Sequence, residues 1–267
     1  MSDELKFKEK EKYDINDLLL IVKKLRSPGG CPWDIEQTHE SIRQSMLEEA
    51  YEVVDAIDLN DEAGLCEELG DVLLQVVFHS QLSAEENTFN FLDVADGICK
   101  KLVGRHPHVF SNVKVKNTEE VLNNWDAIKK EEKNHSTYTD TLESVPKAFP
   151  ALMRATKIQK RAAKVGFDWA SIDGATDKFY EEIGELKEAI KDKDQQKIEE
   201  EFGDLLFSAV NISRFIGVDA EDALGKATSK FTNRFGKVER RAIESGKDIK
   251  YMSLEELDSI WDSIKHD

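Results

Sequence analysis

Pairs of acidic residues three positions apart are the feature of this sequence that first suggests chemistry. Glu182 and Glu185 lie in the run Glu-Glu-Ile-Gly-Glu, and Glu201 and Asp204 lie in the run Glu-Glu-Phe-Gly-Asp. On a helix, this spacing places both carboxylates of a pair on one face. If two such helices pack antiparallel, four carboxylates converge and repel one another in a half-buried cleft. A hard divalent cation would remove this repulsion, so the pairs predict a metal site.

The residue types narrow the choice of metal. Mg²⁺ prefers oxygen ligands, which are all that these pairs offer. A di-iron helical bundle would carry histidine three positions after glutamate, and here Asp204 stands in that position. No imidazole or thiolate accompanies the acidic pairs, which favours Mg²⁺, with Mn²⁺ as a substitute, over iron or zinc.

The same acidic pairs occur a second time, 133 positions earlier in the chain, as Glu49 with Glu52 and Glu68 with Asp71. Charge runs on helices are usually solvated surfaces, and this chain has 54 acidic residues, so a single pair would be assigned to the surface. The duplication with identical internal spacing favours a metal site instead.

Further matches predict two tandem domains. Basic residues follow the acidic pairs in both halves, and each half ends on a Trp-Asp-x-Ile-Lys run; the matching residues are Lys101, Arg105 and Trp125 in the first half and Lys230, Arg234 and Trp261 in the second. We therefore predict homologous domains at residues 14–133 and 148–267. The segment 134–147, rich in Thr and Ser and closed by Pro146, is predicted to link them.

Apolar residues recur at helical spacing in the segments that carry the acidic pairs. The segments 41–59 and 62–82 each form an apolar stripe, and the segments 179–190 and 197–215 repeat the pattern in the second half. An earlier apolar segment ends at Ser27-Pro28-Gly29-Gly30. The sequence lacks an alternating strand pattern with hairpin turns. We predict an all-α fold of antiparallel helical bundles.

Composition limits the partners and the compartment. The net charge of −17 argues against a nucleic-acid backbone as partner, because that contact requires a basic face. No stretch approaches the roughly 18 apolar residues of a membrane helix, and the charged N-terminus lacks an apolar signal core. Cys31, Cys66 and Cys99 show no paired spacing and are interpreted as reduced thiols. We expect a cytoplasmic protein with no membrane contact.

Three residues of the second half are candidates for nucleotide contacts. Lys230 and Arg234 are four positions apart, so they share a helical face and could hold adjacent phosphates, although an ordinary surface pair has the same spacing. Trp261 could stack on a base, although a tryptophan in a short helix can also serve as a core anchor.

With these residues in place, the chain resembles the MazG family of nucleoside triphosphate pyrophosphohydrolases. The family's Glu-Glu-x-x-Glu signature followed by Glu-x-x-Asp occurs in both halves. Three more segments are similar to the family: Ser-Pro-Gly-Gly-Cys-Pro-Trp-Asp at 27–34, Gly-Arg-His-Pro-His-Val-Phe at 104–110, and Lys-Val-Gly-Phe-Asp-Trp at 164–169. The resemblance implies an all-α fold, homodimers, Mg²⁺, and cleavage between the α- and β-phosphates of canonical or aberrant nucleotides.

The resemblance also implies roles for individual residues. Glu182, Glu185, Glu201 and Asp204 match the family's metal ligands. The positions that match its nucleotide pocket are Lys178, Phe179, Tyr180, Glu181, Glu182, Lys197, Ile198, Glu199, Glu200, Lys230, Arg234 and Trp261. The N-terminal half keeps Glu49, Glu52, Glu68 and Asp71 as metal ligands, with Lys101, Arg105 and Trp125 as candidate phosphate and base contacts. It departs in spacing, because twenty residues separate Arg105 from Trp125 and twenty-seven separate Arg234 from Trp261.

The function expected from these features is Mg²⁺-dependent hydrolysis of ribo- or deoxynucleoside triphosphates to monophosphate and pyrophosphate. The carboxylates would hold the metal, and a metal-activated water would attack the α-phosphorus. The absence of Ser-His-Asp or Cys-His sets and of a GxxxxGK[ST] loop argues against a covalent intermediate and against a P-loop enzyme. The alternatives are a nucleotide sensor without turnover and a dimeric helical scaffold.

Overall fold

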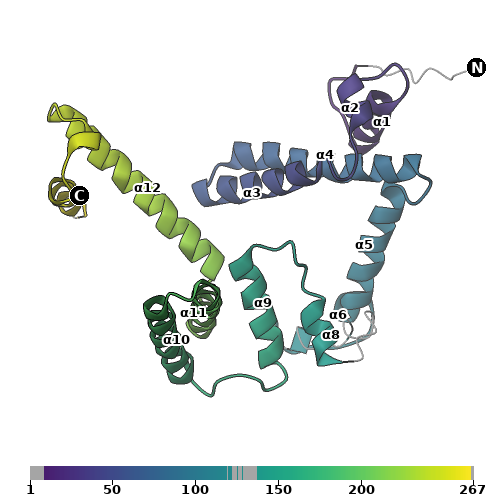
Figure 1. Ribbon diagram of the computed structural model, residues 1–267. Helices are drawn as coiled ribbons and strands as arrows, with labels where there is room; N and C mark the ends of the chain where they lie inside the picture. Colours follow the sequence, from purple (N-terminus) through teal and green to yellow (C-terminus); the bar gives the residue numbers. More distant parts are fainter. Residues whose placement is uncertain (1–8, 119, 122–124, 126–127, 129–136, 266–267) are drawn as a thin grey trace, which may run out of the picture. The chain divides into compact units, whose positions relative to one another are not determined.

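The computed structural model describes residues 9–118, 120–121, 125, 128 and 137–265, and all regular structure in these residues is helical (Figure 1). The chain divides into two compact units, Met1–Glu132 and Lys133–Asp267. Residues 134–136, where the predicted linker begins, and Asp126, Ala127 and Lys129 of the first Trp-Asp-x-Ile-Lys run lie outside the described residues. Within the described residues, none of the helices is long and apolar enough to cross a membrane.

Unit 1 is built around helix α4. Its helices are α1 (Ile15–Arg26), α2 (Pro32–Glu36), α3 (Arg43–Leu59), α4 (Glu62–Glu85), α5 (Phe91–Arg105) and α6 (Pro107–Phe110). A capping box between Asp14 and Asp17 starts α1, and Gly30 follows its end, where a Cβ would lie 2.2 Å from the Leu25 carbonyl oxygen. The core joins α1 to the C-terminal part of α4 through Val22, Ile42, Val77, Phe78 and Leu82.

Unit 2 contains α8 (Tyr138–Glu143), α9 (Ala151–Ala163), α10 (Ile172–Asp192), α11 (Gln195–Phe215), α12 (Ala220–Glu244), the 3₁₀ turn η1 (Ile249–Tyr251) and α13 (Leu254–Ile264). Helix α8 lies inside the segment 134–147 that was expected to be a linker. It forms because Thr137 and Asp140 make a capping box, each side chain accepting a hydrogen bond from the other's backbone N–H. Val145, which follows it, is buried.

The two units repeat one helical hairpin with the same turn. Helices α3 and α4 pack side by side, and so do α10 and α11 (Figure 1). Asn60 and Lys193, 133 positions apart, both adopt the left-handed conformation, with φ of 55° and 57°. Asp61 and Asp194 follow them and cap the next helix; the Asp61 carboxylate accepts hydrogen bonds from two backbone N–H groups and the Asp194 carboxylate from one. The sequence repeat is therefore also a repeat of backbone geometry.

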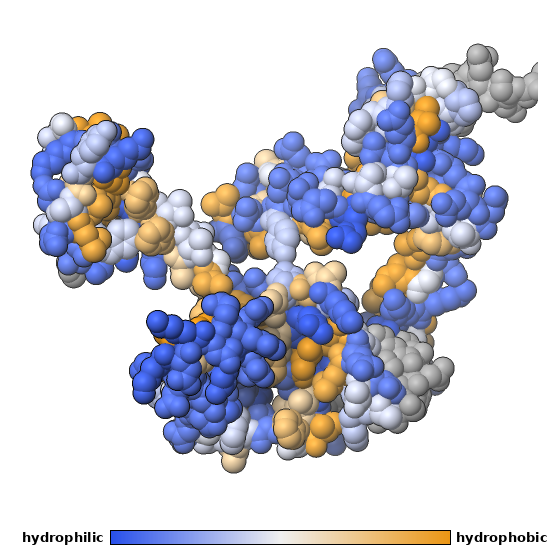
Figure 2. Space-filling view, viewed as in Figure 1, coloured by the Kyte–Doolittle hydropathy of each residue, from blue (hydrophilic) through white to orange (hydrophobic). Residues whose placement is uncertain are grey.

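Both hairpins leave apolar side chains open to solvent at equivalent positions. The stripe expected to be core is buried only in part, because nothing within the described part of either unit covers the outer face of its hairpin. Exposed pairs related by the repeat are Ile57 and Ile190, Leu69 and Phe202, and Leu73 and Leu206. Figure 2 shows hydrophobic side chains at the surface of a mostly hydrophilic chain.

Candidate functional site

The hairpin of α10 and α11 brings three of the four predicted C-terminal ligands together. One oxygen each from Glu182, Glu201 and Asp204 can lie within 4.8 Å of the others. Glu182 is buried at 4% exposure, Glu201 is half-buried and Asp204 is exposed, so the C-terminal acidic cluster, as we call these three residues, opens to solvent at one side. Glu185 lies one turn further along α10, exposed and outside this close group.

Glu182 has one satisfied and one unsatisfied oxygen. Its Oε1 forms an ion pair with Lys178 Nζ at 2.8 Å, while its Oε2 is buried without a hydrogen-bond partner. A buried carboxylate oxygen without a partner is costly in a protein interior. A divalent cation held with Glu201 and Asp204 would satisfy it, so the residues present fit a hard metal ion.

The electrostatics of Glu185 support the same conclusion. Burial raises the pKa of the Glu185 carboxyl, and the negative charge of Glu201 raises the pKa further, with Lys178 acting in the opposite direction. The negative charge of the cluster therefore affects the pKa of Glu185, although Glu185 lies outside the close group. A carboxylate whose charge is disfavoured by its neighbours is stabilised by a nearby cation.

The N-terminal hairpin holds the equivalent triad. Glu49, Glu68 and Asp71 form the N-terminal acidic cluster, all three half-buried, with one oxygen of each within 4.8 Å of the others. Burial is the largest cause raising the pKa of Glu49 and of Glu68, and the charges of Asp71 and Glu52 add to it. Glu52 is exposed and is not one of the three, but its side chain lies within hydrogen-bond reach of Glu49 and of Glu68, a contact that Glu185 does not make with the C-terminal cluster. The repeat thus reproduces the geometry of the cluster.

Aromatic and basic side chains gather where α13 folds back on α12. The Arg234 guanidinium lies 5.9 Å from the centre of the Trp261 ring, and the Phe231 ring lies 5.3 Å from that ring. Phe231 is exposed and Trp261 is half-buried, so one side of this aromatic group is open. Sequence reasoning missed Phe231, although its position three residues before Arg234 puts it on the same face of α12.

The remaining predicted pocket residues occupy the flanks of the hairpin and of α12. Phe179 and Tyr180 make an edge-on ring contact at 6.0 Å, and Glu181 pairs with Lys178. Lys197, Ile198, Glu199 and Glu200 lie in the first two turns of α11, and Lys230 is exposed on α12. In the described part of the chain, no hydrogen bond, ion pair or ring contact joins the C-terminal acidic cluster to Lys230, Arg234 or Trp261.

Unit 1 holds a less complete counterpart of the aromatic group. Lys101 is exposed and Arg105 half-buried at the end of α5, and the Trp125 ring lies 6.4 Å from the His106 ring. His106, which belongs to the segment 104–110 and was not expected to contact Trp125, is the N-cap of α6 and also lies 5.6 Å from the His108 ring.

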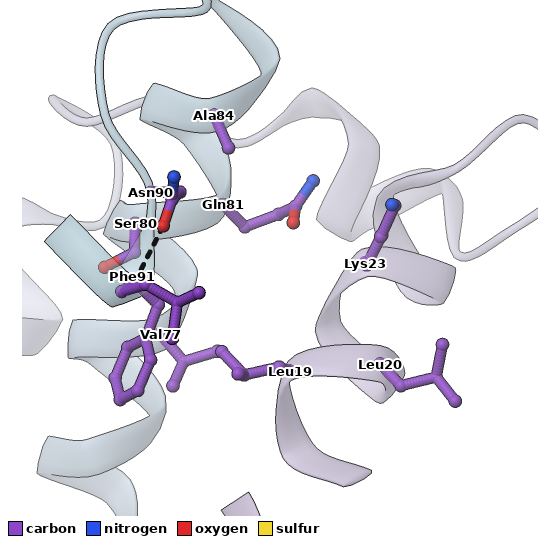
Figure 3. Close-up of a pocket in the computed structure, with 10 residues that line it drawn as sticks. Leu19, Leu20, Lys23, Val77, Ser80, Gln81, Ala84, Asn90 and Phe91 are labelled. Carbon is purple, nitrogen blue, oxygen red and sulfur yellow. Dashed lines mark hydrogen bonds between the residues drawn. The ribbon is translucent and has the colours of Figure 1, made fainter. Parts of the chain in front are cut away.

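A cavity of about 370 Å³ lies between α1, α4 and the start of α5. Figure 3 shows its lining, in which Leu19, Val77 and Phe91 are apolar and Lys23 and Gln81 are polar. Asn90 at its edge accepts a hydrogen bond from the Leu92 backbone N–H at 2.8 Å. None of the acidic cluster residues lines this cavity, so it is separate from the candidate site.

The chain is similar to known proteins along nearly its whole length. The profile of the MazG nucleotide pyrophosphohydrolase domain matches residues 37–110 and 173–238, each of which contains one acidic cluster. A protein of Escherichia coli strain K12 named nucleoside triphosphate pyrophosphohydrolase is 47% identical over 254 residues, which cover 94% of this chain and 97% of that protein. The Thermotoga maritima nucleoside triphosphate pyrophosphohydrolase/pyrophosphatase MazG is 46% identical over 249 residues, covering 93% and 94%. The uncharacterized protein YabN of Bacillus subtilis is 47% identical over 246 residues, covering 92% of this chain and 50% of YabN.

Proposed function

Because the chain belongs to the MazG nucleotide pyrophosphohydrolase family, we propose that it hydrolyses nucleoside triphosphates to nucleoside monophosphates and pyrophosphate. The observation that carries this proposal to particular residues is the buried, unpartnered Oε2 of Glu182 within a group of three carboxylates. We assign Mg²⁺ as the cofactor, with Mn²⁺ as a substitute, because the ligands are all oxygens.

The C-terminal acidic cluster is the proposed metal site. Glu182, Glu201 and Asp204 would hold the ion, and Glu185 completes the set from the next turn of α10. A divalent ion held there would neutralise phosphate charge and lower the pKa of a bound water. Glu182, Glu201 and Asp204 would be committed to the ion, so we assign Glu185, which lies outside their close group and whose pKa is raised, to accept the proton of the attacking water.

The nucleotide contacts are proposed on α12 and α13. Trp261 and Phe231 offer aromatic faces on which a base can stack, and any base can use them. Lys230 and Arg234 share a face of α12 and would bind the β- and γ-phosphates. The Lys197–Glu200 stretch of α11 and the Lys178–Glu182 stretch of α10 would line the same pocket.

We propose that the C-terminal domain, residues 148–267, carries most of the activity and that the N-terminal domain, residues 14–133, binds Mg²⁺ through Glu49, Glu52, Glu68 and Asp71. The two halves differ in the segment that follows the proposed metal ligands: the Arg105–Trp125 spacing is seven residues shorter than the Arg234–Trp261 spacing. This difference would shift the ring on which the base stacks, and a displacement of about 1 Å can lower the rate on the order of 100-fold.

We further propose that the enzyme is a homodimer. The exposed apolar faces of the two hairpins occur at equivalent positions, and a second copy of the chain is the occupant that would bury them. Among the described residues of one chain, the C-terminal acidic cluster makes no direct contact with Arg234, Phe231 or Trp261. A second copy would add further helices around this site. With a net charge of −17, we expect no nucleic-acid partner.

Two double variants test the assignment. Pyrophosphate release from a panel of nucleoside triphosphates is measured with Mg²⁺ for Glu201→Gln/Asp204→Asn and for Glu68→Gln/Asp71→Asn. We expect the first to abolish turnover and the second to retain most of it, with Glu188→Gln, an exposed glutamate of α10, as the matched control. The reverse order would show that the halves are assigned the wrong way round, and equal losses would show that both halves are catalytic.

Pyrophosphate release together with isothermal titration separates an enzyme from a nucleotide sensor and from a scaffold. A nucleotide sensor would bind nucleotide with Mg²⁺ in isothermal titration but release no pyrophosphate, whereas a scaffold would show no coupled binding. Turnover in the wild type that is lost in Glu201→Gln/Asp204→Asn would exclude both classes.

A further inference from the structure

Lys178 places a positive charge directly on the C-terminal acidic cluster. It lies one helical turn before Glu182 on α10, and its Nζ is 2.8 Å from Glu182 Oε1 and 2.9 Å from Glu181 Oε1. The side chain of Lys178 is 37% exposed while that of Glu182 is only 5% exposed. The ammonium group therefore sits at the open edge of the cluster, where a flexible lysine can leave the carboxylate without unpacking the helix.

An ammonium group and a divalent cation compete for the same carboxylate. A metal ion that used the unpartnered Oε2 of Glu182 would share this carboxylate with the Lys178 ammonium on Oε1. A unit charge and a double charge roughly 5 Å apart repel strongly enough, even at the dielectric constant of water, to weaken metal binding by on the order of tenfold. The lysine thus opposes a metal ion that arrives alone.

A nucleotide changes this balance, because its phosphates supply anionic oxygens to which a lysine can move. We propose that Lys178 is an exchangeable counter-ion: it pairs with Glu182 while the site is empty and moves to the phosphates when the nucleotide brings its divalent cation. The C-terminal site therefore takes metal and nucleotide together and holds metal poorly on its own. This inference rests on the proposed function for the identity of the nucleotide, but its cation part stands on the ion-pair geometry alone.

The repeat supplies an internal contrast. The residue equivalent to Lys178 in the first half is Ser45, four positions before Glu49 on α3. Within the described residues, no lysine or arginine pairs with Glu49, Glu68 or Asp71. The two clusters share ligand types and spacing but differ by one contacting cation, so the change from Lys178 to Ser imports the N-terminal arrangement into the C-terminal site.

The test measures Mn²⁺ binding rather than turnover. The full-length chain carries Glu68→Gln/Asp71→Asn throughout, so that only the C-terminal cluster binds. Free Mn²⁺ is measured by electron paramagnetic resonance, without nucleotide and with the non-hydrolysable α,β-methylene analogue of ATP. The variants are Lys178→Ser, Lys178→Arg, which keeps the charge, and Lys187→Ser, which removes an exposed positive charge from the same helix away from the cluster.

We expect Lys178→Ser to bind Mn²⁺ on the order of tenfold more tightly without nucleotide, and the analogue to enhance its Mn²⁺ binding by a correspondingly smaller factor. Lys178→Arg and Lys187→Ser should behave like the parent. Unchanged or weaker Mn²⁺ binding by Lys178→Ser, or equal tightening in Lys187→Ser, would overturn the inference. A chain that shows the Lys178 effect on Mn²⁺ but releases no pyrophosphate would instead refute the proposed function and leave the counter-ion role intact.

Discussion

Replacing Glu201 by Gln should stabilise the metal-free protein although it removes a proposed metal ligand. Oxygens of Glu182, Glu201 and Asp204 lie within 4.8 Å of one another, so Glu201 has two carboxylate neighbours. At the dielectric constant of water, each such neighbour costs about 0.9 kcal/mol at that distance. Attraction from Lys178, which already pairs with Glu182, offsets part of the sum. The net gain on neutralising Glu201 is therefore about 1 kcal/mol.

Thermal unfolding followed by circular dichroism checks this value. In EDTA, the unfolding temperature of Glu201→Gln should lie about 3–4 °C above the wild type, given the usual entropy of unfolding of a unit of this size. With Mg²⁺ and the α,β-methylene analogue of ATP together the order should reverse, because the wild type gains the binding free energy of the ion and the nucleotide and the variant gains less. Glu188→Gln, an exposed and isolated change on α10, should unfold like the wild type in both buffers.

A lower unfolding temperature for Glu201→Gln than for the wild type in EDTA would contradict this prediction. Such a result would mean that the carboxylate of Glu201 makes favourable contacts in the metal-free state and that the three carboxylates do not repel one another. The site would then be a satisfied polar network rather than a cluster that waits for a cation.

Three further predictions concern the base platform, the N-terminal cluster and the assembly. Trp261→Ala should raise the KM for nucleoside triphosphates by roughly tenfold to 100-fold, with a smaller change in kcat. Trp261→Phe keeps an aromatic ring for stacking and should retain most of the affinity. An unchanged KM in Trp261→Ala would show that the Trp261 ring does not contact the nucleotide. The pKa of Glu68 is raised above its ordinary value of 4.5, so the folded state holds this proton more tightly than the unfolded state. In EDTA, the free energy of unfolding measured with urea should therefore fall as the pH rises above 4.5, and Glu68→Gln should make this fall less steep. The same pH dependence in Glu68→Gln as in the wild type would contradict the raised pKa. Light scattering should give twice the chain mass of 30.4 kDa for the wild type and the single mass for Phe202→Glu; a wild-type monomer at micromolar concentration would contradict the dimer.

The helical architecture could be predicted because its signals are local. Apolar spacing marked the helices that became α3, α4, α10 and α11, and the breaker at Ser27–Gly30 marked the end of α1. Helix α8 was missed because a stretch rich in Thr and Ser was interpreted as a linker. The same residues contain a capping box, Thr137 with Asp140, which is a sequence signal of a helix start.

The turn between the paired helices shows a limit of single-residue reasoning. Lysine has no intrinsic preference for the left-handed conformation that Lys193 adopts at φ 57°. Its counterpart Asn60 tolerates that conformation well, and Asp61 and Asp194 cap the following helix in both units. Alignment of the repeat, rather than the propensity of Lys193, therefore carries the information that the hairpin turns there.

The candidate site was predictable in composition but not in detail. Periodicity gave the acidic pairs a common face, yet the structure brings only three carboxylates of each quartet into a close group and leaves Glu52 and Glu185 at the edge. The spacing of Phe231 from Arg234 placed it on the right face of α12, but its contact with Trp261 exists only after α13 folds back on α12. Such contacts between helices depend on packing, which spacing along the chain does not encode.

A duplicated motif does not duplicate its chemistry. Both halves repeat the ligand types, the spacing, the turn and the close triad. They differ in the side chain one turn before the first ligand, which is Ser45 in one and Lys178 in the other. At that position Lys178 brings an ammonium group to within 2.8 Å of the Glu182 carboxylate, whereas Ser45 carries no charge. Because a contacting charge alters cation binding far more than a distant one, the metal ligands alone cannot rank the two sites, and the residues beside the ligands must be compared.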